Sequence, residues 1–300
     1  MRNDRRLLWG VGAFLVIGAA LVGGALAGCS SCAGGGTWSS GLDFIGASPE
    51  AVSVMEKNSG NEAAQAAEES YVITARELFE DQKDEPKRVM AYVGVPGDAS
   101  YIGGSIHLPL EQVFNQDGTL KSPAEIAGLF GAAGISEGDP LVIYGDSFVN
   151  GYDTFAFWIM KYLGHQNVAL LEGTRGGREA AGLKFVATPT PKAAETYTID
   201  PDLNLLATAD QLAGAQLVDA RSPAEYVGGH LEGAINIDYS KVMDASGLAS
   251  PQALSQTFSG LDKNQPVVVY SSKGGQASIV WYALYTQGYQ ASLYILDNQS

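Results

Sequence analysis

The sequence is almost free of cysteine. Its two cysteines, Cys29 and Cys32, both lie near the N-terminus, so residues 33–300 contain no thiol. A disulfide framework, a cysteine-ligated metal site and a cysteine nucleophile are therefore excluded from that part of the chain. The three histidines, His107, His165 and His230, are dispersed and lack clustered carboxylates. We therefore expect no metal site, and no motif indicates another cofactor.

Basic residues are also scarce. The chain has 18 lysines and arginines against 33 acidic residues, a net charge of −15 at pH 7. Such a chain is repelled by phosphate backbones, so we expect no nucleic-acid partner. Charged residues make up 17% and hydrophobic residues 46% of the chain, and the mean hydropathy is +0.01. This composition excludes both a charge-rich disordered chain and a polytopic membrane protein.

The sequence has one long uncharged run, from Leu7 to Gly28, which follows the arginines of residues 2–6. It ends in Leu26-Ala27-Gly28, directly before Cys29, and so resembles a bacterial lipobox. The resemblance implies that residues 1–28 are a lipoprotein signal peptide and that Cys29 carries the lipid. A signal anchor is the alternative, because the run is just long enough to cross about 30 Å of hydrocarbon.

The predicted lipid on Cys29 also indicates where in the cell the protein is located. Residues 29–69 are rich in glycine, serine and alanine and are typical of a flexible tether between a membrane and a folded part. Ser30 is not the aspartate that retains lipoproteins in the inner membrane, so the resemblance implies export to the outer membrane of a Gram-negative host. The periplasmic and cell-surface faces both remain open.

The folded part contains an internal repeat of about 125 residues. Apolar runs alternate with helical patterns, which is typical of parallel α/β sheets. We predict two domains, 70–187 and 205–300, joined by a proline-containing linker at 188–204. The matching segments are 74–78 with 208–212, 101–106 with 226–231, and 140–144 with 266–270. The first segment of each copy has a threonine that we expect to cap a helix, and each copy continues into an apolar helix through Trp158 or Trp281.

The second copy carries an ordered series of motifs. They run from Leu217-Val218-Asp219-Ala220-Arg221 through Glu225-Tyr226 and Gly229-His230-Leu231 to Gly233-Ala234-Ile235-Asn236. Together they resemble the rhodanese superfamily, and two tandem copies resemble the two-domain thiosulfate sulfurtransferases. The resemblance implies an α/β fold of two rhodanese-like domains, each a parallel sheet between helical layers.

The resemblance also directs attention to the loop Ser271-Ser272-Lys273-Gly274-Gly275-Gln276, between a strand and a helix. Backbone N–H groups in such a loop point at one centre and bind an anion there. In active rhodaneses the first loop residue is a cysteine that carries sulfur as a persulfide, whereas this chain has Ser271. We name no catalytic residue and keep two interpretations. In one the loop is a residual anion site with Lys273 as its basic residue; in the other Ser271 and Ser272 only cap the helix.

The remaining motif residues have structural interpretations. Asp219 and Arg221 are expected to form an ion pair that supports the loop, with a direct substrate role as the alternative. His230 is expected to bond to local backbone. In the first copy, Asp146 and Asp153 would oppose a bound anion, so we expect no site there.

Three functions follow from these observations. The leading hypothesis is a catalytically degenerate, membrane-anchored binding or scaffold module with a protein partner in the cell envelope. Rhodanese-family lipoproteins beside outer-membrane electron conduits have a similar build, and the second copy lacks the first copy's Gly turn and closing helix, which predicts a thinly covered sheet face. The alternatives are a sulfurtransferase that acts on thiosulfate or a related sulfur or selenium oxyanion at an atypical site, and a non-catalytic oxyanion-binding protein.

Overall fold

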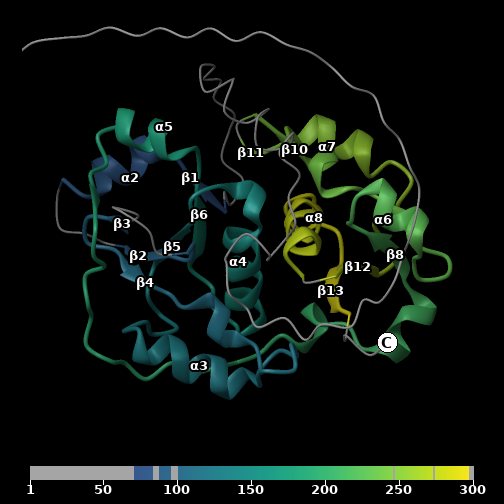
Figure 1. Cartoon of the computed structure of the whole chain (residues 1–300), viewed down its shortest axis with the longest axis horizontal. Coiled ribbons are helices and arrows are strands. Elements are labelled where there is room, and N and C mark those ends of the chain that lie inside the picture. The colour runs from purple at the N-terminus through teal and green to yellow at the C-terminus, as the bar shows by residue number, and fades with distance from the viewer. Residues whose placement is uncertain (1–70, 84–87, 96–100, 246, 273, 297–300) are drawn as a thin grey trace, which may run out of the picture. The chain divides into compact units, whose positions relative to one another are not determined.

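The computed structural model (Figure 1) describes residues 71–83, 88–95, 101–245, 247–272 and 274–296, all within one compact unit, Ser40–Ser300. The predicted signal peptide, the predicted lipid site at Cys29, the predicted tether and Lys273 lie outside the described residues. No helix among the described residues is long and apolar enough to span a membrane.

The first half of the fold is a five-stranded parallel sheet with strand order β1-β6-β5-β2-β4. Its elements in chain order are β1 (Val72–Ile73), α2 (Ala75–Asp81), β2 (Val89–Tyr92), β3 (Tyr101–Ile102), β4 (Ile106–His107), η2 (Leu110–Val113), α3 (Pro123–Ala132), β5 (Leu141–Tyr144), η3 (Phe148–Asn150), α4 (Tyr152–Tyr162), β6 (Val168–Leu171), α5 (Arg175–Ala180) and β7 (Phe185–Val186). Strands β3 and β7 form a separate antiparallel pair.

The second half repeats this plan with a four-stranded parallel sheet of order β13-β12-β8-β9. Its elements are η4 (Leu203–Leu205), η5 (Ala209–Gly214), β8 (Gln216–Asp219), α6 (Pro223–Gly228), β9 (Ile235–Asn236), η6 (Tyr239–Val242), β10 (Met243–Asp244), β11 (Gly247–Leu248), α7 (Pro251–Thr257), β12 (Val267–Ser271), α8 (Gly275–Thr286) and β13 (Ala291–Ile295). The predicted α/β fold with two parallel sheets is therefore confirmed.

Strand register shows which positions of the two copies correspond. Tyr144 of β5 pairs with Tyr92 of β2, and Tyr270 of β12 pairs with Asp219 of β8. The residue after each central tyrosine, Gly145 or Ser271, begins the connection to a buried helix. The two strand-to-helix loops therefore leave equivalent points of their sheets.

Side-chain caps explain where several helices begin. Thr74 caps α2 in a capping box with Glu77, as predicted. Thr208 makes the equivalent capping box with Gln211 but opens a 3₁₀ helix, η5, instead of an α-helix. None of the η5 residues is buried, so little packing favours an α-helix there.

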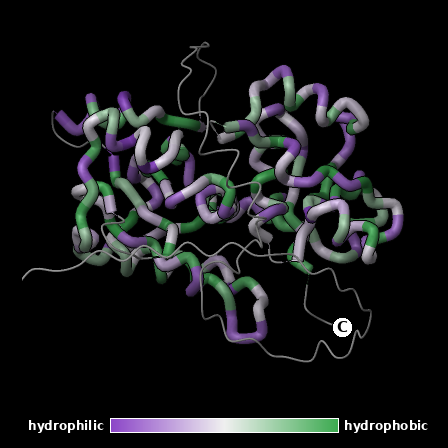
Figure 2. The backbone as a smooth tube through the Cα atoms, turned by 45° about the horizontal axis from the view of Figure 1, so that its top comes forward, coloured by the Kyte–Doolittle hydropathy of each residue, from purple (hydrophilic) through white to green (hydrophobic). Residues whose placement is uncertain are grey.

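The hydrophobic core is continuous across the two sheets, and one cluster contains Trp158 of α4 and Trp281 of α8. Figure 2 shows hydrophobic segments within the fold and hydrophilic segments in its outer turns. Helices α4 and α8 contact each other directly, and the hydroxyl oxygens of Thr154 and Ser278 lie 2.8 Å apart. The contact is close because Gly151, with φ +68°, lies against Gly275, so that a Cβ added at Gly151 would lie 2.7 Å from the Gly275 carbonyl oxygen.

The predicted linker is hydrogen-bonded to the first half along much of its length. Its backbone N–H groups at Thr190, Glu195, Asp200 and Asp202 donate to carbonyl oxygens of residues 105, 131, 163 and 162. The hydroxyl of Tyr197, a buried linker residue, lies 2.9 Å from Nδ1 of His165. The segment is therefore an integral part of the first half.

Candidate functional site

The loop between β12 and α8 begins at Ser271, which is buried (1% exposed). Its Oγ accepts a hydrogen bond from the backbone N–H of Ala277 at 3.1 Å, in the first turn of α8. The hydroxyl therefore satisfies a helix N–H that has no partner within the helix, as the capping interpretation predicted for Ser271. Ser272 is exposed, and no cap of α8 by its side chain occurs among the described residues.

The remainder of the loop is built from glycine. Gly274 adopts a left-handed conformation with φ +82°, and a Cβ there would lie 3.3 Å from the ring of Phe155. Gly275 opens the 12-residue helix α8, and Gln276 is 6% exposed. A left-handed glycine followed by a helix start is the backbone arrangement from which anion-binding concavities are commonly built.

Ser271 has no base beside it. Its hydroxyl makes one side-chain hydrogen bond among the described residues, to Ala277, and neither a histidine nor a carboxylate contacts it. A serine hydroxyl needs an adjacent general base to act as a nucleophile. Among the described residues, no histidine or carboxylate is therefore placed to activate Ser271.

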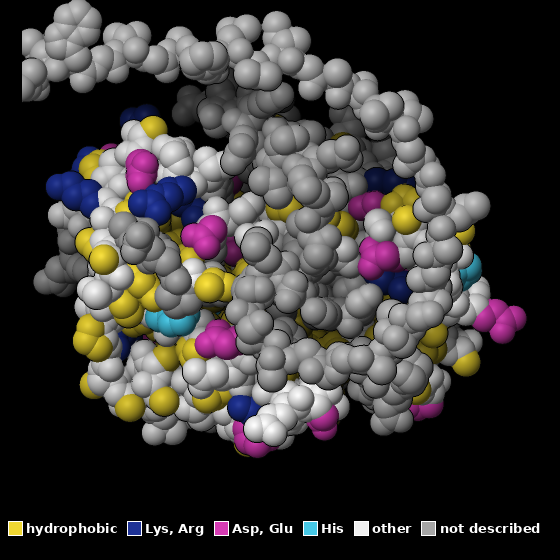
Figure 3. Space-filling model, in the orientation of Figure 1, with side chains coloured by type: hydrophobic (Ala, Val, Ile, Leu, Met, Phe, Trp, Pro, Cys, Tyr) yellow, Lys and Arg dark blue, Asp and Glu magenta, His cyan; other side chains and the backbone are white. Residues whose placement is uncertain are grey.

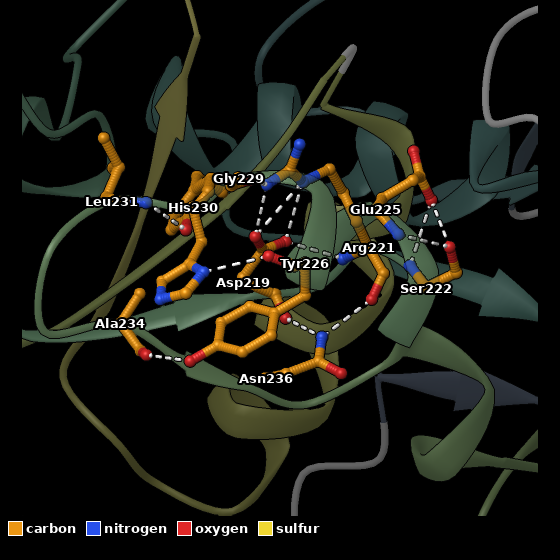
Figure 4. Close-up of polar contacts among 11 residues, drawn as sticks. Asp219, Arg221, Ser222, Glu225, Tyr226, Gly229, His230, Leu231, Ala234 and Asn236 are labelled. Carbon is orange, nitrogen blue, oxygen red and sulfur yellow. Dashed lines mark hydrogen bonds and ion pairs between the residues drawn. The ribbon is translucent and has the colours of Figure 1, made fainter.

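The Asp219–Arg221 pair lies at the carboxyl end of β8 (Figure 4). Arg221 Nη2 lies 2.6 Å from Asp219 Oδ2, and Nε donates to both carboxylate oxygens. Asp219 is fully buried, and Arg221 Nη2 also donates to the carbonyl oxygen of Gly229. The predicted structural ion pair is confirmed, and it joins the end of β8 to the turn after α6.

Asn236 completes this support, a role that the sequence motif did not reveal. Its amide nitrogen donates to the carbonyl oxygens of Asp219 and Arg221, at 3.0 and 2.8 Å. The asparagine stood in the Gly-Ala-Ile-Asn motif, but only the parallel pairing of β8 with β9 brings it beside the end of β8.

The other motif residues are structural too. Glu225 forms the capping box of α6 with Ser222, and the Tyr226 hydroxyl donates to the carbonyl oxygen of Ala234 (Figure 4). His230 Nδ1 lies 2.9 Å from the Tyr226 carbonyl oxygen, as predicted, and the two rings stack 3.8 Å apart.

The equivalent loop of the first half has different chemistry. The Tyr92 hydroxyl donates to Asp146 Oδ2 at 2.7 Å, whereas Asp153, in the first turn of α4, is buried (1% exposed). Arg178 of α5 is also buried, and it donates to the carbonyl oxygens of Gly145, Leu171 and Glu172. The sequence analysis missed Arg178, because its polar surroundings on α5 are typical of an exposed helix.

Burial is the largest effect on the pKa of Asp153 and raises it to about 6. The positive charge of Arg178 and the backbone N–H groups of Gly145 and Asp153 itself act in the opposite direction, and the negative charge of Asp146 adds to the rise. Asp153 therefore takes up a proton at a higher pH than an exposed aspartate does.

Several exposed basic side chains of the described residues lie near one another and are ion-paired. In Figure 3 dark blue side chains gather over the region of α2 and α5 in Figure 1. Three of the cations there are ion-paired with acidic residues nearby: Lys83 with Glu80, Arg88 with Asp81, and Arg175 with Glu179. No group of three or more potential metal ligands occurs among the described residues.

Comparison with known proteins agrees with this geometry. Residues 203–298 match the rhodanese-like domain family. The chain is 29% identical over 214 residues to a Saccharopolyspora erythraea protein provisionally named a thiosulfate sulfurtransferase, covering 62% of this chain and 75% of that one. It is 30% identical over 184 residues to the thiosulfate sulfurtransferase of Corynebacterium glutamicum, covering 53% and 61% of the two chains.

Solved structures show the same fold across both halves. SseA of Escherichia coli, described as a 3-mercaptopyruvate sulfotransferase, superposes with a TM-score of 0.68 at 20% identity, covering 75% of this chain and 98% of that one. Tum1 of Saccharomyces cerevisiae gives 0.61 at 15% identity, with coverages of 74% and 91%. The fold is thus that of a protein with two rhodanese-like domains. Residues 203–298 thus match the rhodanese-like domain family, and over a longer stretch the chain is similar to thiosulfate sulfurtransferases.

Proposed function

We propose that the protein binds a thiosulfate-class oxyanion at the loop of residues 271–276 and forms no persulfide there. The observation that carries this proposal is the hydrogen bond that the Ser271 side chain makes. Its side chain caps α8 in the place where active rhodaneses have their cysteine, and the glycine-built loop beyond it keeps its N–H groups for an anion. Lys273 is the basic residue proposed to add charge attraction.

Sulfur transfer is the second candidate, and the names of the relatives favour it over the scaffold hypothesis. Without an enzyme thiol, it would proceed in one displacement. An acceptor thiolate attacks the outer sulfur of bound thiosulfate, the S–S bond breaks, and its electron pair leaves with sulfite. The acceptor becomes a persulfide, and the loop N–H groups stabilise the charge on the departing sulfite.

Membrane anchoring and a partner in the cell envelope are proposals that rest on the sequence alone. The lipobox-like residues before Cys29 support export and a lipid anchor, and the outer membrane follows from Ser30. Labelling of the full chain with a radioactive fatty acid tests this point, because Cys29→Ala should remove the label and Cys32→Ala should not.

The decisive experiment measures thiosulfate binding and thiosulfate:cyanide sulfurtransferase activity side by side. We expect the native chain to bind thiosulfate, as seen by calorimetry, and Lys273→Ala to weaken that binding. Ser271→Cys should acquire persulfide-forming activity, because it adds the thiolate that the loop lacks. Ser255→Cys, which places a thiol on the exposed surface of α7, is the matched control and should stay inactive.

The outcomes of this experiment distinguish the candidate functions. Binding without turnover supports the oxyanion-binding proposal. Turnover by the native chain that needs Lys273 and leaves no sulfur on the protein supports direct transfer. Absence of thiosulfate binding in the native chain, together with inactivity of Ser271→Cys, would reject an anion site in this loop.

A further inference from the structure

One face of the second-half sheet has less cover than its counterpart in the first half. Among the described residues, the hydrophobic cluster around Tyr144 contains eleven buried side chains and the cluster around Tyr270 contains five. In the first half this face is covered by α2, the β3–β7 pair and α5, whose Arg178 lies over the ring of Tyr144. The described part of the second half ends one residue after β13 and contains no counterpart of α5 or β7, and its η5 and α6 bury no residue.

Equivalent positions of the two halves show what this difference exposes. By strand register, Tyr294 of β13 corresponds to Leu171 of β6. Leu171 is 3% exposed, whereas Tyr294 is only partly buried. In the internal repeat Val227 corresponds to Ile102, and these residues are 82% and 1% exposed. Ile102 pairs with Phe185 of β7, so the missing elements account for the exposed apolar surface of the second half.

The N-terminal part of the chain contains a segment with the signals of a helix. The sequence has four Ser-Pro pairs, and the first of them is Ser48-Pro49. The other three all begin α-helices, α3, α6 and α7, with the serine as the cap and the proline in the first turn. The same signal predicts a helix over residues 49–57, which lie outside the described residues.

This predicted helix is amphipathic. At about 100° per residue, one face carries the four apolar side chains Ala51, Val52, Val54 and Met55. The opposite face carries the polar side chains Glu50, Ser53, Glu56 and Lys57. A helix this short is marginally stable in water, so it needs an apolar surface on which to pack.

The chain enters the described fold beside the second half. The ring of Tyr71 lies 5.1 Å from the ring of Tyr285 of α8, and the Tyr282 hydroxyl donates to the carbonyl oxygen of Tyr71 at 3.2 Å. Residues 58–70 can span about 45 Å when extended, and a four-stranded sheet is only about 14 Å wide. They contain no apolar side chain larger than alanine, so residues 51–55 supply the nearest large apolar side chains before β1.

We propose that residues 49–57 form an amphipathic helix that packs its apolar face on the second-half sheet, over Tyr294 and Leu296, in the place that α5 has in the first half. The short connection to Tyr71 gives this segment a high effective concentration at the face, which favours it over a second copy or another protein. The predicted tether between Cys29 and the fold is then shortened to residues 29–48.

The test measures the reactivity of single thiols in the full-length chain, purified in detergent, with Cys29 and Cys32 replaced by serine. Met55→Cys should react with a maleimide about tenfold more slowly than Ser53→Cys, because a packed thiol reacts only when the helix detaches. The two positions lie two residues apart on opposite faces of the predicted helix, so Ser53→Cys is the matched control.

A second substitution locates the surface that protects the thiol. Tyr294→Asp should make Met55→Cys react as fast as Ser53→Cys, because it places a charge under the apolar face of the helix. Gln252→Asp, on the exposed surface of α7, should leave the slow reaction unchanged. Leu296→Asp, just beyond β13, should act like Tyr294→Asp and replaces it if that variant does not fold.

Equal reactivity of the two thiols overturns the proposal, and so does slow reaction of Met55→Cys that persists with an aspartate at position 294 or 296. Protection that weakens on dilution of the protein assigns the face to a second copy. Protection that requires a cell-envelope extract assigns it to another protein, and either result overturns the proposal. None of these measurements involves Ser271, so their outcome is independent of the function proposed for its loop.

Discussion

At the scale of single residues, burial determines how much a charged side chain contributes to the stability of this protein. Arg178 donates to three carbonyl oxygens at the ends of β5 and β6, and its charge attracts the buried carboxylate of Asp153. Its exposed neighbour on α5, Arg175, makes a surface ion pair with Glu179. Two arginines three residues apart therefore have very different energetic roles.

Replacing Arg178 by methionine should lower the free energy of unfolding by about 3–5 kcal/mol, because it leaves three carbonyl oxygens without their donor and removes the charge attraction to Asp153. Arg175→Met, the matched control, should cost less than about 1 kcal/mol. Urea unfolding measures both. Equal losses in the two variants would contradict this account of Arg178.

Asp153 should make stability depend on pH in an unusual direction. Its pKa is raised to about 6 in the folded chain, against about 3.9 when unfolded, so the folded state holds the proton more tightly. The stabilising contribution is complete below pH 4 and is lost as the pH rises through 6, a change of about 3 kcal/mol.

The measurement is the difference in unfolding free energy between the native chain and Asp153→Asn, from pH 4 to pH 7.5. The native chain should gain on the variant as the pH falls. His107 and His165, whose pKa values are lowered by burial, oppose this trend in both proteins and cancel in the difference. A difference that does not change with pH would contradict the raised pKa.

At the scale of elements, the contact between α4 and α8 depends on a glycine. Gly151→Ala should cost about 1–2 kcal/mol for its left-handed conformation and about 1–3 kcal/mol more for overlap with the carbonyl of Gly275. Gly118 is a matched control, since its φ is +88° and no atom lies within 4 Å of an added Cβ. Thermal unfolding should show the larger loss for Gly151→Ala, and similar losses would argue against close packing of the two helices.

The elements themselves were largely predictable because their signals are local. Apolar runs located β5 and β12, and Thr74 marked the start of α2. The type of the helix after Thr208 was not predictable, since packing decides between an α-helix and a 3₁₀ helix.

The candidate site was predictable only where its motif is contiguous. The sequence identified the loop at Ser271 and the pairing of Asp219 with Arg221. It did not identify Arg178 or the burial of Asp153, because these depend on strands β5 and β6 lying side by side. Such long-range contacts leave no periodic trace in the sequence.

At the scale of the whole molecule, the shared hydrophobic cluster predicts that the two halves unfold together. Trp158 and Trp281 report on opposite halves and are both fully buried. Chemical unfolding followed by fluorescence in Trp158→Phe and in Trp281→Phe should therefore give transitions with the same midpoint. A clear difference between the two midpoints would show that the halves are independent.

The hydrogen-bonded linker limits how far the halves can separate. The carbonyl oxygen of Leu205 accepts a hydrogen bond from Trp158 Nε1 of the first half, and the N–H of Ala207 already donates to the carbonyl oxygen of Leu293 in the second half. A single residue, Leu206, separates these two anchors. Each half is thus held near its partner at an effective concentration of millimolar or more. A break in the α4–α8 contact would therefore be followed by rapid reclosure, so brief openings would expose little surface to proteases or to other chains.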